Sequence, residues 1–392
     1  MIRLNIMVYF FLIFCGCKNS DNQNSISNKP NHKNTLEARF PYLLKYPASS
    51  SGFPRSMEPD GSIRGVKSTD WTSGFYPGSL LYLYRITESE AYLDSAKKWL
   101  PFIAPEQTND RTHDMGFKVY CSIGNANEIT PNEEWQKIIV KSAETLSTRF
   151  NKNTGCIKSW DFGGDRWKYP VIIDNMMNLE LLFEASKISG NNLFYDIAVS
   201  HAIKTMENHF REDNSSYHVV DYDPESGEVL QRLTHQGFDA ESVWSRGQAW
   251  GLYGFTMVYR FTEDSHFLDK AMEIADFITN QNNMPEDRIP YWDMKAPNIP
   301  NSIRDASAAA VTASALLELE SFKNGKGYGD YARSILESLS SEAYLLAPSV
   351  DGPFILDHST GNYPAQDELD LPINYADYYF LEALYRSKTE LF

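Results

Sequence analysis

One helical pattern recurs four times between residues 81 and 339, and it limits the possible folds of this 392-residue chain more than any other feature. Each copy contains the end of an apolar helix, a polar turn, aromatic or leucine residues, an aspartate, and an alanine two residues further on. The copies align at Ala96, Ala198, Ala271 and Ala332. Repeated helical hairpins of this kind either stack into an open solenoid or close into a ring.

The two helices of each hairpin differ in composition. The second is amphipathic, with charges such as Lys97, Lys98 and Glu273 on one face, whereas the first is apolar or small nearly all round, as in "SAAAVTASALLEL". A helix without a polar face is surrounded by protein, so the first helix is predicted to lie inside and the second outside. Six inner helices are predicted to begin near Gly74, Asp114, Asp174, Ser245, Arg304 and Pro372.

We therefore predict an all-α fold, an (α/α)6 barrel in which six helical hairpins form a toroid. A plain α-solenoid is the alternative. The segment "TLEARFPYLLKY", which begins at Thr35, can supply the sixth outer helix and close the ring. This closing helix and the irregular loops favour the barrel. Two long insertions, residues 151–169 and 213–243, are predicted to be non-helical and functional.

The N-terminal residues "MIRLNIMVYFFLIFCGC" contain one arginine, a short apolar run and two cysteines. The run is too short to cross a bilayer and is typical of a secretory signal peptide. The cysteines resemble the lipobox of bacterial lipoproteins, with Cys17 as the expected lipidated residue. The predicted order is a signal peptide over residues 1–16, a tether over 17–35 and a single catalytic barrel over 36–392. We expect a lipid-anchored protein of the bacterial cell envelope, at the outer membrane or the periplasmic face.

The remaining cysteines and the net charge narrow the possible chemistry. Cys121 and Cys156 form neither a disulfide framework nor a metal-binding spacing, so they are interpreted as ordinary thiols, with one bridge possible in an oxidising compartment. The formal net charge is −16 and no Lys/Arg run is present, which argues against a nucleic-acid partner. No metal and no cofactor are expected. An anionic substrate would need particular arginines set against this negative field.

Each predicted inner helix begins with a cluster of polar or aromatic residues. The clusters are "DWTSGFYPG", "THDMGF", "IIDNMMN", "SVWSRGQAWG", "IRDASAAA" and "PINYADYY". In a helical toroid these starts would line one rim or the central cavity. The scattered clusters therefore predict a single site.

Two carboxylates stand out within these clusters. Asp114 and Asp174 lie among Gly, Met and Asn residues, and two carboxylates in one pocket are a common acid/base pair. The alternative is that both cap helices. Arg246 and Trp250 are four residues apart and share a helix face, a pairing that suits an anionic sugar or, equally, a buried cation–π contact.

The segments "WTSGFYPG", "HDMGF", "IIDNMMNLELL", "SVWSRGQAWGLYGF", "DASAAAVTASALLEL" and "DYYFLEAL" together resemble the unsaturated glucuronyl hydrolases. The resemblance runs from Asp70 to Leu384, in the order of the family's motifs. It implies an (α/α)6 barrel that acts on unsaturated uronyl oligosaccharides left by polysaccharide lyases, derived from glycosaminoglycans or ulvan. Their non-reducing uronate carries a double bond between C4 and C5.

The resemblance also implies roles for individual residues. Asp174 matches the general acid/base, and Asp114 matches a second essential carboxylate that holds the sugar hydroxyls. Four residues match those that contact the unsaturated ring, and two more are expected beside it; the six are His218, Gln236, Arg246, Trp250, His113 and Trp71. The usual glycine of the last motif is Ala376 here.

The implied reaction hydrates a vinyl ether. An acid protonates C4, water adds at C5, and the resulting hemiketal opens and releases the next sugar. Donation near neutral pH requires a raised pKa, which the apolar neighbours of Asp174 are expected to supply. The alternatives are an unsaturated rhamnogalacturonyl hydrolase acting on pectin fragments, an inverting glycosidase, and a non-catalytic surface glycan-binding lipoprotein.

Overall fold

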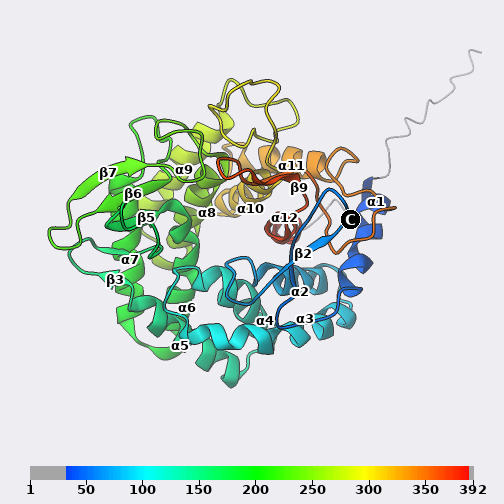
Figure 1. Ribbon diagram of the computed structural model, residues 1–392, viewed down its shortest axis with the longest axis horizontal. Coiled ribbons are helices and arrows are strands. Elements are labelled where there is room, and N and C mark those ends of the chain that lie inside the picture. The colour runs from blue at the N-terminus through cyan, green and yellow to red at the C-terminus, as the bar shows by residue number, and fades with distance from the viewer. Residues whose placement is uncertain (1–31, 388–392) are drawn as a thin grey trace, which may run out of the picture. The chain divides into compact units, whose positions relative to one another are not determined.

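The computed structural model describes residues 32–387, in which paired helices form a closed ring (Figure 1). The inner helices are α2 (Phe75–Thr87), η3 (Gly116–Gly124) with α4 (Asn125–Ile129), η4 (Ile173–Asn178) with α6 (Leu179–Ser189), α8 (Ser245–Thr262), α10 (Ala306–Phe322) and α12 (Asn374–Arg386). The outer helices are α1 (His32–Arg39) with η1 (Phe40–Leu44), α3 (Glu90–Ile103), α5 (Glu133–Ser147), α7 (Asn192–Asn208), α9 (Ser265–Thr279) and α11 (Tyr328–Leu339), and η2 (Ala104–Thr108) follows α3.

Contacts between the inner helices close the ring. Each packs against the next in chain order, and α12 returns to pack against α2. The predicted (α/α)6 barrel is therefore confirmed, and the open solenoid is wrong. Close approach depends on small residues: a Cβ placed at Gly78 of α2 would lie 2.4 Å from the carbonyl oxygen of Cys121 in η3.

The predicted division into inner and outer helices follows from side-chain chemistry. In α10 every residue from Ala306 to Leu316 is buried, because small and apolar side chains cover all its faces. In α11 the buried positions recur at Tyr328, Ala332, Ile335 and Leu339, which is the spacing of a single helix face. The outer helices therefore turn a charged face to solvent while their apolar face covers the inner ring.

Short strands lie within the connections. They are β1 (Phe53–Met57) with β2 (Ile63–Val66), β3 (Phe150–Asn151) with β4 (Cys156–Ile157), the sheet of β5 (Tyr169–Ile172), β6 (Val219–Tyr222) and β7 (Val229–Leu233), and β8 (Ser359–Asn362) with β9 (Asp367–Leu371). The sheet of β5, β6 and β7 joins the two predicted insertions, since Tyr169 of β5 pairs with Tyr222 of β6. This sheet leads directly into η4 and so places the start of that inner helix.

The signal peptide and Cys17 lie outside the described residues. Helix α1 begins at His32, so the end of the predicted tether is helical. The buried Arg39 fixes this helix by donating to the carbonyl oxygens of Val350, Gly352 and Phe354. Within residues 32–387, no helix has the length and apolar character needed to cross a membrane. Cys121 and Cys156 are buried, free thiols, so the possible bridge between them is not formed.

Candidate active site

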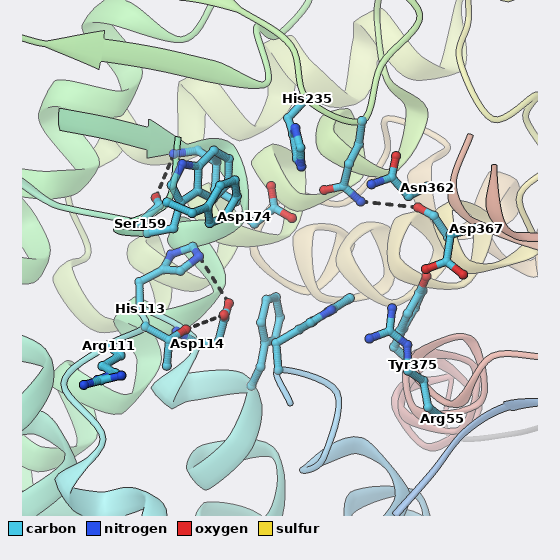
Figure 2. A pocket seen from close by; sticks show the side chains of 18 residues that line it. Arg55, Arg111, His113, Asp114, Ser159, Asp174, His235, Asn362, Asp367 and Tyr375 are labelled. Atoms are coloured by element: carbon cyan, nitrogen blue, oxygen red, sulfur yellow. Dashed lines mark hydrogen bonds and ion pairs between the residues drawn. The ribbon is translucent and has the colours of Figure 1, made fainter. Parts of the chain in front are cut away.

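A cavity of about 390 Å³ lies at the N-terminal ends of the inner helices (Figure 2). Its lining combines the predicted helix starts with loop and strand residues. The lining residues are Arg55, Trp71, Arg111, Thr112, His113, Asp114, Phe117, Ser159, Trp160, Phe162, Ile172, Asp174, His235, Gln236, Gly361, Asn362, Asp367 and Tyr375. The predicted single site at the helix starts thus corresponds to one cavity. In the part of the chain that the structure describes, no group of three or more His, Cys, Asp or Glu side chains is placed to hold a metal ion.

Asp174 lies in the first turn of η4 and is 7% exposed. The residue at the N-cap of η4 is Ile172, and no side chain caps this helix, so the capping alternative does not describe Asp174. Its Oδ2 atom has no hydrogen-bond partner among the described residues. Asp305 shows the contrast, because its carboxylate caps α10 by accepting from the N–H groups of Ser307 and Ala308 at 3.0 and 3.4 Å. Asp174 is therefore a buried carboxyl group without a capping role.

Burial raises the pKa of Asp174 to about 7. The positive charge of Arg246, the N–H of Asp174 itself and Trp250 oppose this rise, whereas the negative charge of Asp114 adds to it. The apolar neighbours Ile173 and Met176 are fully buried as well, which is consistent with burial as the main cause of the raised pKa. At neutral pH such a group is populated in both forms, and it can first donate and then accept a proton.

The ring of His218 directs an N–H group toward Asp174. Its Nδ1 atom accepts hydrogen bonds from the backbone N–H groups of His235 and Gln236, each at 3.1 Å. Burial, with the charges of His235 and Arg246, holds the pKa of His218 well below its usual value, so the ring is neutral. In a neutral ring whose Nδ1 accepts, Nε2 carries the hydrogen. This Nε2 lies 3.6 Å from Oδ2 of Asp174.

Asp114 lies across the cavity from Asp174 (Figure 2) and is held by two neighbours in sequence. The hydroxyl of Thr112 donates to its Oδ2 at 2.5 Å, and Nε2 of His113 lies 3.2 Å from its Oδ1. Burial lowers the pKa of His113, which favours the neutral ring. Asp114 is not the N-cap of η3, since Met115 occupies that position. The two carboxylates thus face one cavity.

Arg246 and Trp250 lie in the wall rather than at the cavity surface. Arg246 is 1% exposed, pairs with Asp305 at 2.9 Å, and donates to the carbonyl oxygens of Thr360 and Gly361. The guanidinium also contacts the rings of Trp244 and Tyr375, with its Cζ atom 4.6 and 5.1 Å from their centroids.

The cation–π contacts of Arg246 are therefore with rings other than Trp250. Trp250 is fully buried against Phe117 and Tyr379. Its effect on the pKa of Asp174 shows that it lies near that carboxyl group. Arg246 and Trp250 thus act on the site from behind Asp174.

The other predicted site residues surround the two carboxylates. Trp71 packs edge-on or tilted against Phe75, Phe117 and Tyr375, with one side on the cavity. The side-chain amide of Gln236 donates to the carbonyl oxygen of Gly361 at 3.3 Å. Of the predicted residues, Trp71, His113, Asp114, Asp174 and Gln236 line the cavity, while His218, Arg246 and Trp250 lie behind that lining.

Several residues of the site were not predicted from the sequence. Tyr375 and Asp305 lie in helix-start clusters that the sequence singles out, but neither was assigned a role. Arg55 comes from β1, which carries no motif, and it reaches the cavity because Glu368 holds its guanidinium through two hydrogen bonds of 2.7 and 2.8 Å. Tyr375 and Asp305 could have been predicted as site residues only from their position at the start of an inner helix. No signal in the sequence marks Arg55.

The ring of helical hairpins and the paired carboxylates at its rim define a class of enzyme, the glycoside hydrolases built on an (α/α)6 barrel. The model of Glycosyl Hydrolase Family 88 matches residues 53–383. An unsaturated glucuronyl hydrolase of Formosa agariphila is 49% identical over 97% of this chain and 95% of its own length. The chain therefore belongs to Glycosyl Hydrolase Family 88, and the predicted resemblance is confirmed.

Two solved structures agree with this assignment. An unsaturated glucuronyl hydrolase described as specific for heparin has a TM-score of 0.88 and 47% identity, and the match covers 92% of this chain and 98% of that one. The Bacillus sp. GL1 enzyme, described as responsible for the degradation of glycosaminoglycan, has a TM-score of 0.83 and 30% identity over 90% of this chain and 95% of that one. The fold and the family assignment are thus consistent.

Proposed function

We propose that Asp174 is the residue with which this unsaturated glucuronyl hydrolase hydrates the C4=C5 double bond of a terminal unsaturated uronate. The observation that carries the proposal is a buried carboxyl group at the cavity surface whose pKa is raised to about 7. Protonated Asp174 donates its proton to C4, and positive charge develops toward C5 and the ring oxygen. The carboxylate that remains accepts a proton from the water that adds at C5. The hemiketal then opens and the glycosidic bond breaks.

The surrounding groups support this proton transfer. The Nε2–H of His218 points toward the oxygen that loses its proton, so it stabilises the carboxylate as it forms. Asp114, oriented by Thr112 and His113, accepts hydrogen bonds from sugar hydroxyls at the opposite side of the cavity. Trp71 supplies a flat apolar face for the ring.

The substrates that we propose are lyase-generated disaccharides from glycosaminoglycans, because one similar structure is described as specific for heparin and another as responsible for the degradation of glycosaminoglycan. Turnover is measured as loss of the ultraviolet band of the conjugated enol acid. In deuterated water, the product should carry one solvent deuterium at C4, because that hydrogen comes from the acid. An unlabelled C4 would contradict the proposal. Comparing turnover of glycosaminoglycan-derived, ulvan-derived and rhamnogalacturonan-derived disaccharides distinguishes the alternative substrates.

The pH dependence of kcat/KM gives a separate test of Asp174. Its protonated form is the donor, and its pKa is raised to about 7, so the active form is present below that pH and is lost above it. We expect kcat/KM to fall about tenfold per pH unit on the alkaline side of a midpoint near pH 7.

Glu180 provides a control for the pH profile. Burial raises the pKa of this carboxyl group to about 7 as well, but Glu180 pairs with Arg260 and does not line the cavity. The Glu180→Gln variant should therefore retain the alkaline midpoint of the wild type. A midpoint that moves with Glu180 would assign the titration to that residue instead.

We also propose that the protein is anchored in the cell envelope through Cys17, because an apolar run followed by Cys-Gly-Cys ends the leader. Cys17→Ser should release the protein from the membrane fraction, as measured by fractionation and immunoblotting. Cys15→Ser is the matched control and should leave the protein attached. Retention of the Cys17→Ser protein on the membrane would exclude this residue as the lipidation site.

A further inference from the structure

Arg111 is a cavity-lining arginine without an internal partner. Its side chain is exposed, and its guanidinium makes no ion pair or hydrogen bond with any residue between 32 and 387. Arg55 lies at the other end of the cavity in Figure 2 and differs in this respect, because Glu368 and Asp70 neutralise it. The protein has a net charge of −16, which repels anions in general. A cation without a partner in the cavity can therefore attract an anionic group to this particular place.

Phe162 is an exposed aromatic side chain on the same cavity. It is 53% exposed, although large apolar side chains are usually buried. One of its faces stacks on Trp160, with ring centroids 4.8 Å apart and an angle of 20° between the planes. Trp160 in turn packs against His235 and Trp167, so the ring beneath Phe162 is itself supported by other aromatic side chains. An exposed, supported aromatic face beside a sugar cavity suits stacking with a pyranose ring.

Arg149 brings the two loops together. Its Nη1 atom donates both to the carbonyl oxygen of Asp110 at 2.6 Å and to Oδ2 of Asp161 at 2.9 Å. Asp110 and Asp161 immediately precede Arg111 and Phe162. The guanidinium of Arg149 therefore holds the two loop segments that carry Arg111 and Phe162. Arg111 and Phe162 therefore belong to the same side of the cavity, although they are 51 positions apart in sequence (162 − 111).

We propose that Arg111 and Phe162 form the subsite for the sugar that follows the unsaturated uronate, with Phe162 stacking on that sugar and Arg111 binding an anionic substituent on it. This inference rests on the proposed function and specifies its substrate class. Sulfate and carboxylate both accept paired hydrogen bonds from a planar guanidinium, so either group satisfies the geometry. Arg149 is a positioning residue, because it holds both loops without lining the cavity.

The test compares three substrates: an unsaturated disaccharide, its 6-sulfated form on the second sugar, and an unsaturated disaccharide whose second sugar is a uronate. The wild type should prefer at least one of the two anionic forms, and the preferred form identifies the anionic group. Arg111→Gln should lower kcat/KM for that form by about tenfold while changing the neutral one by less than about twofold. The wild-type preference should shrink as ionic strength rises, and that of Arg111→Gln should not.

Two further variants complete the experiment. Phe162→Ala should raise KM about three- to tenfold on all three substrates, since stacking does not depend on charge. Arg333→Gln removes an exposed arginine of α11 and should reproduce wild-type kinetics, which controls for net charge. Equal losses on neutral and anionic substrates in Arg111→Gln, or unchanged kinetics in both cavity variants, would overturn the subsite. A wild type that turns over none of the three would overturn the proposed function, and this inference with it.

Discussion

Asp174→Asn is expected to lower kcat on an unsaturated disaccharide by about 10²–10⁴-fold, the usual contribution of general acid–base catalysis. The amide keeps the shape of the carboxyl group but cannot donate a proton to C4. The fold should remain intact, because Oδ2 of Asp174 has no hydrogen-bond partner to lose and Asp174 caps no helix. The measurement is steady-state turnover, with disaccharide binding followed by calorimetry.

The controls separate a catalytic role from a structural one. Circular dichroism and denaturant unfolding of Asp174→Asn should match the wild type within about 1 kcal/mol, since removal of a buried carboxyl group adds no unpaired charge. Asn caps helices as well as Asp does, so a purely capping role predicts nearly normal turnover. A well-folded variant that keeps more than a tenth of wild-type kcat would remove Asp174 from the mechanism.

Arg246→Lys is expected to lower kcat/KM by about 10²-fold or more, although Arg246 lies behind the cavity surface. The guanidinium uses Nη1 for Asp305 and Thr360 and Nη2 for Gly361. Lysine keeps the charge beside Asp305 but lacks the planar two-nitrogen fork that reaches all three acceptors. Gly361 lines the cavity and accepts from Gln236, so its displacement disturbs the substrate side of the wall. The carbonyl oxygen of Gly361 keeps its hydrogen bond from Gln236, but a buried acceptor such as Thr360 that loses its donor should also lower the free energy of unfolding by about 1–3 kcal/mol.

Arg386→Lys is the matched control for this prediction. Arg386 pairs with Glu318 and Glu382 and does not line the cavity. Its replacement should lower stability while kcat/KM stays near that of the wild type. If Arg246→Lys loses stability but keeps full turnover, then Arg246 has only a structural role. The contacts by which Arg246 connects Asp305 to Thr360 and Gly361 would then be unimportant for catalysis.

The helical ring follows from the sequence because its signals are local. The alternation of all-apolar helices such as α10 with amphipathic ones such as α11 can be recognised within a few helical turns, and it dictates which helix lies inside. The clusters that begin the inner helices then predict one shared site. The apolar neighbours of Asp174 in the sequence correctly predict that this carboxyl group is buried and that its pKa is raised.

The wall of the site depends on contacts between distant segments, and these were decided only by tertiary packing. Arg246 was predicted to face the sugar because it shares a helix face with Trp250, but its charge requires a buried partner, and Asp305 at the N-cap of α10 supplies it. The tautomer of His218 depends on the backbone of residues 235 and 236. Arg111 and Phe162 meet through Arg149. Helical periodicity determines which face of a helix is buried, whereas pairing of buried charges and backbone groups depends on which loops the closed ring brings together.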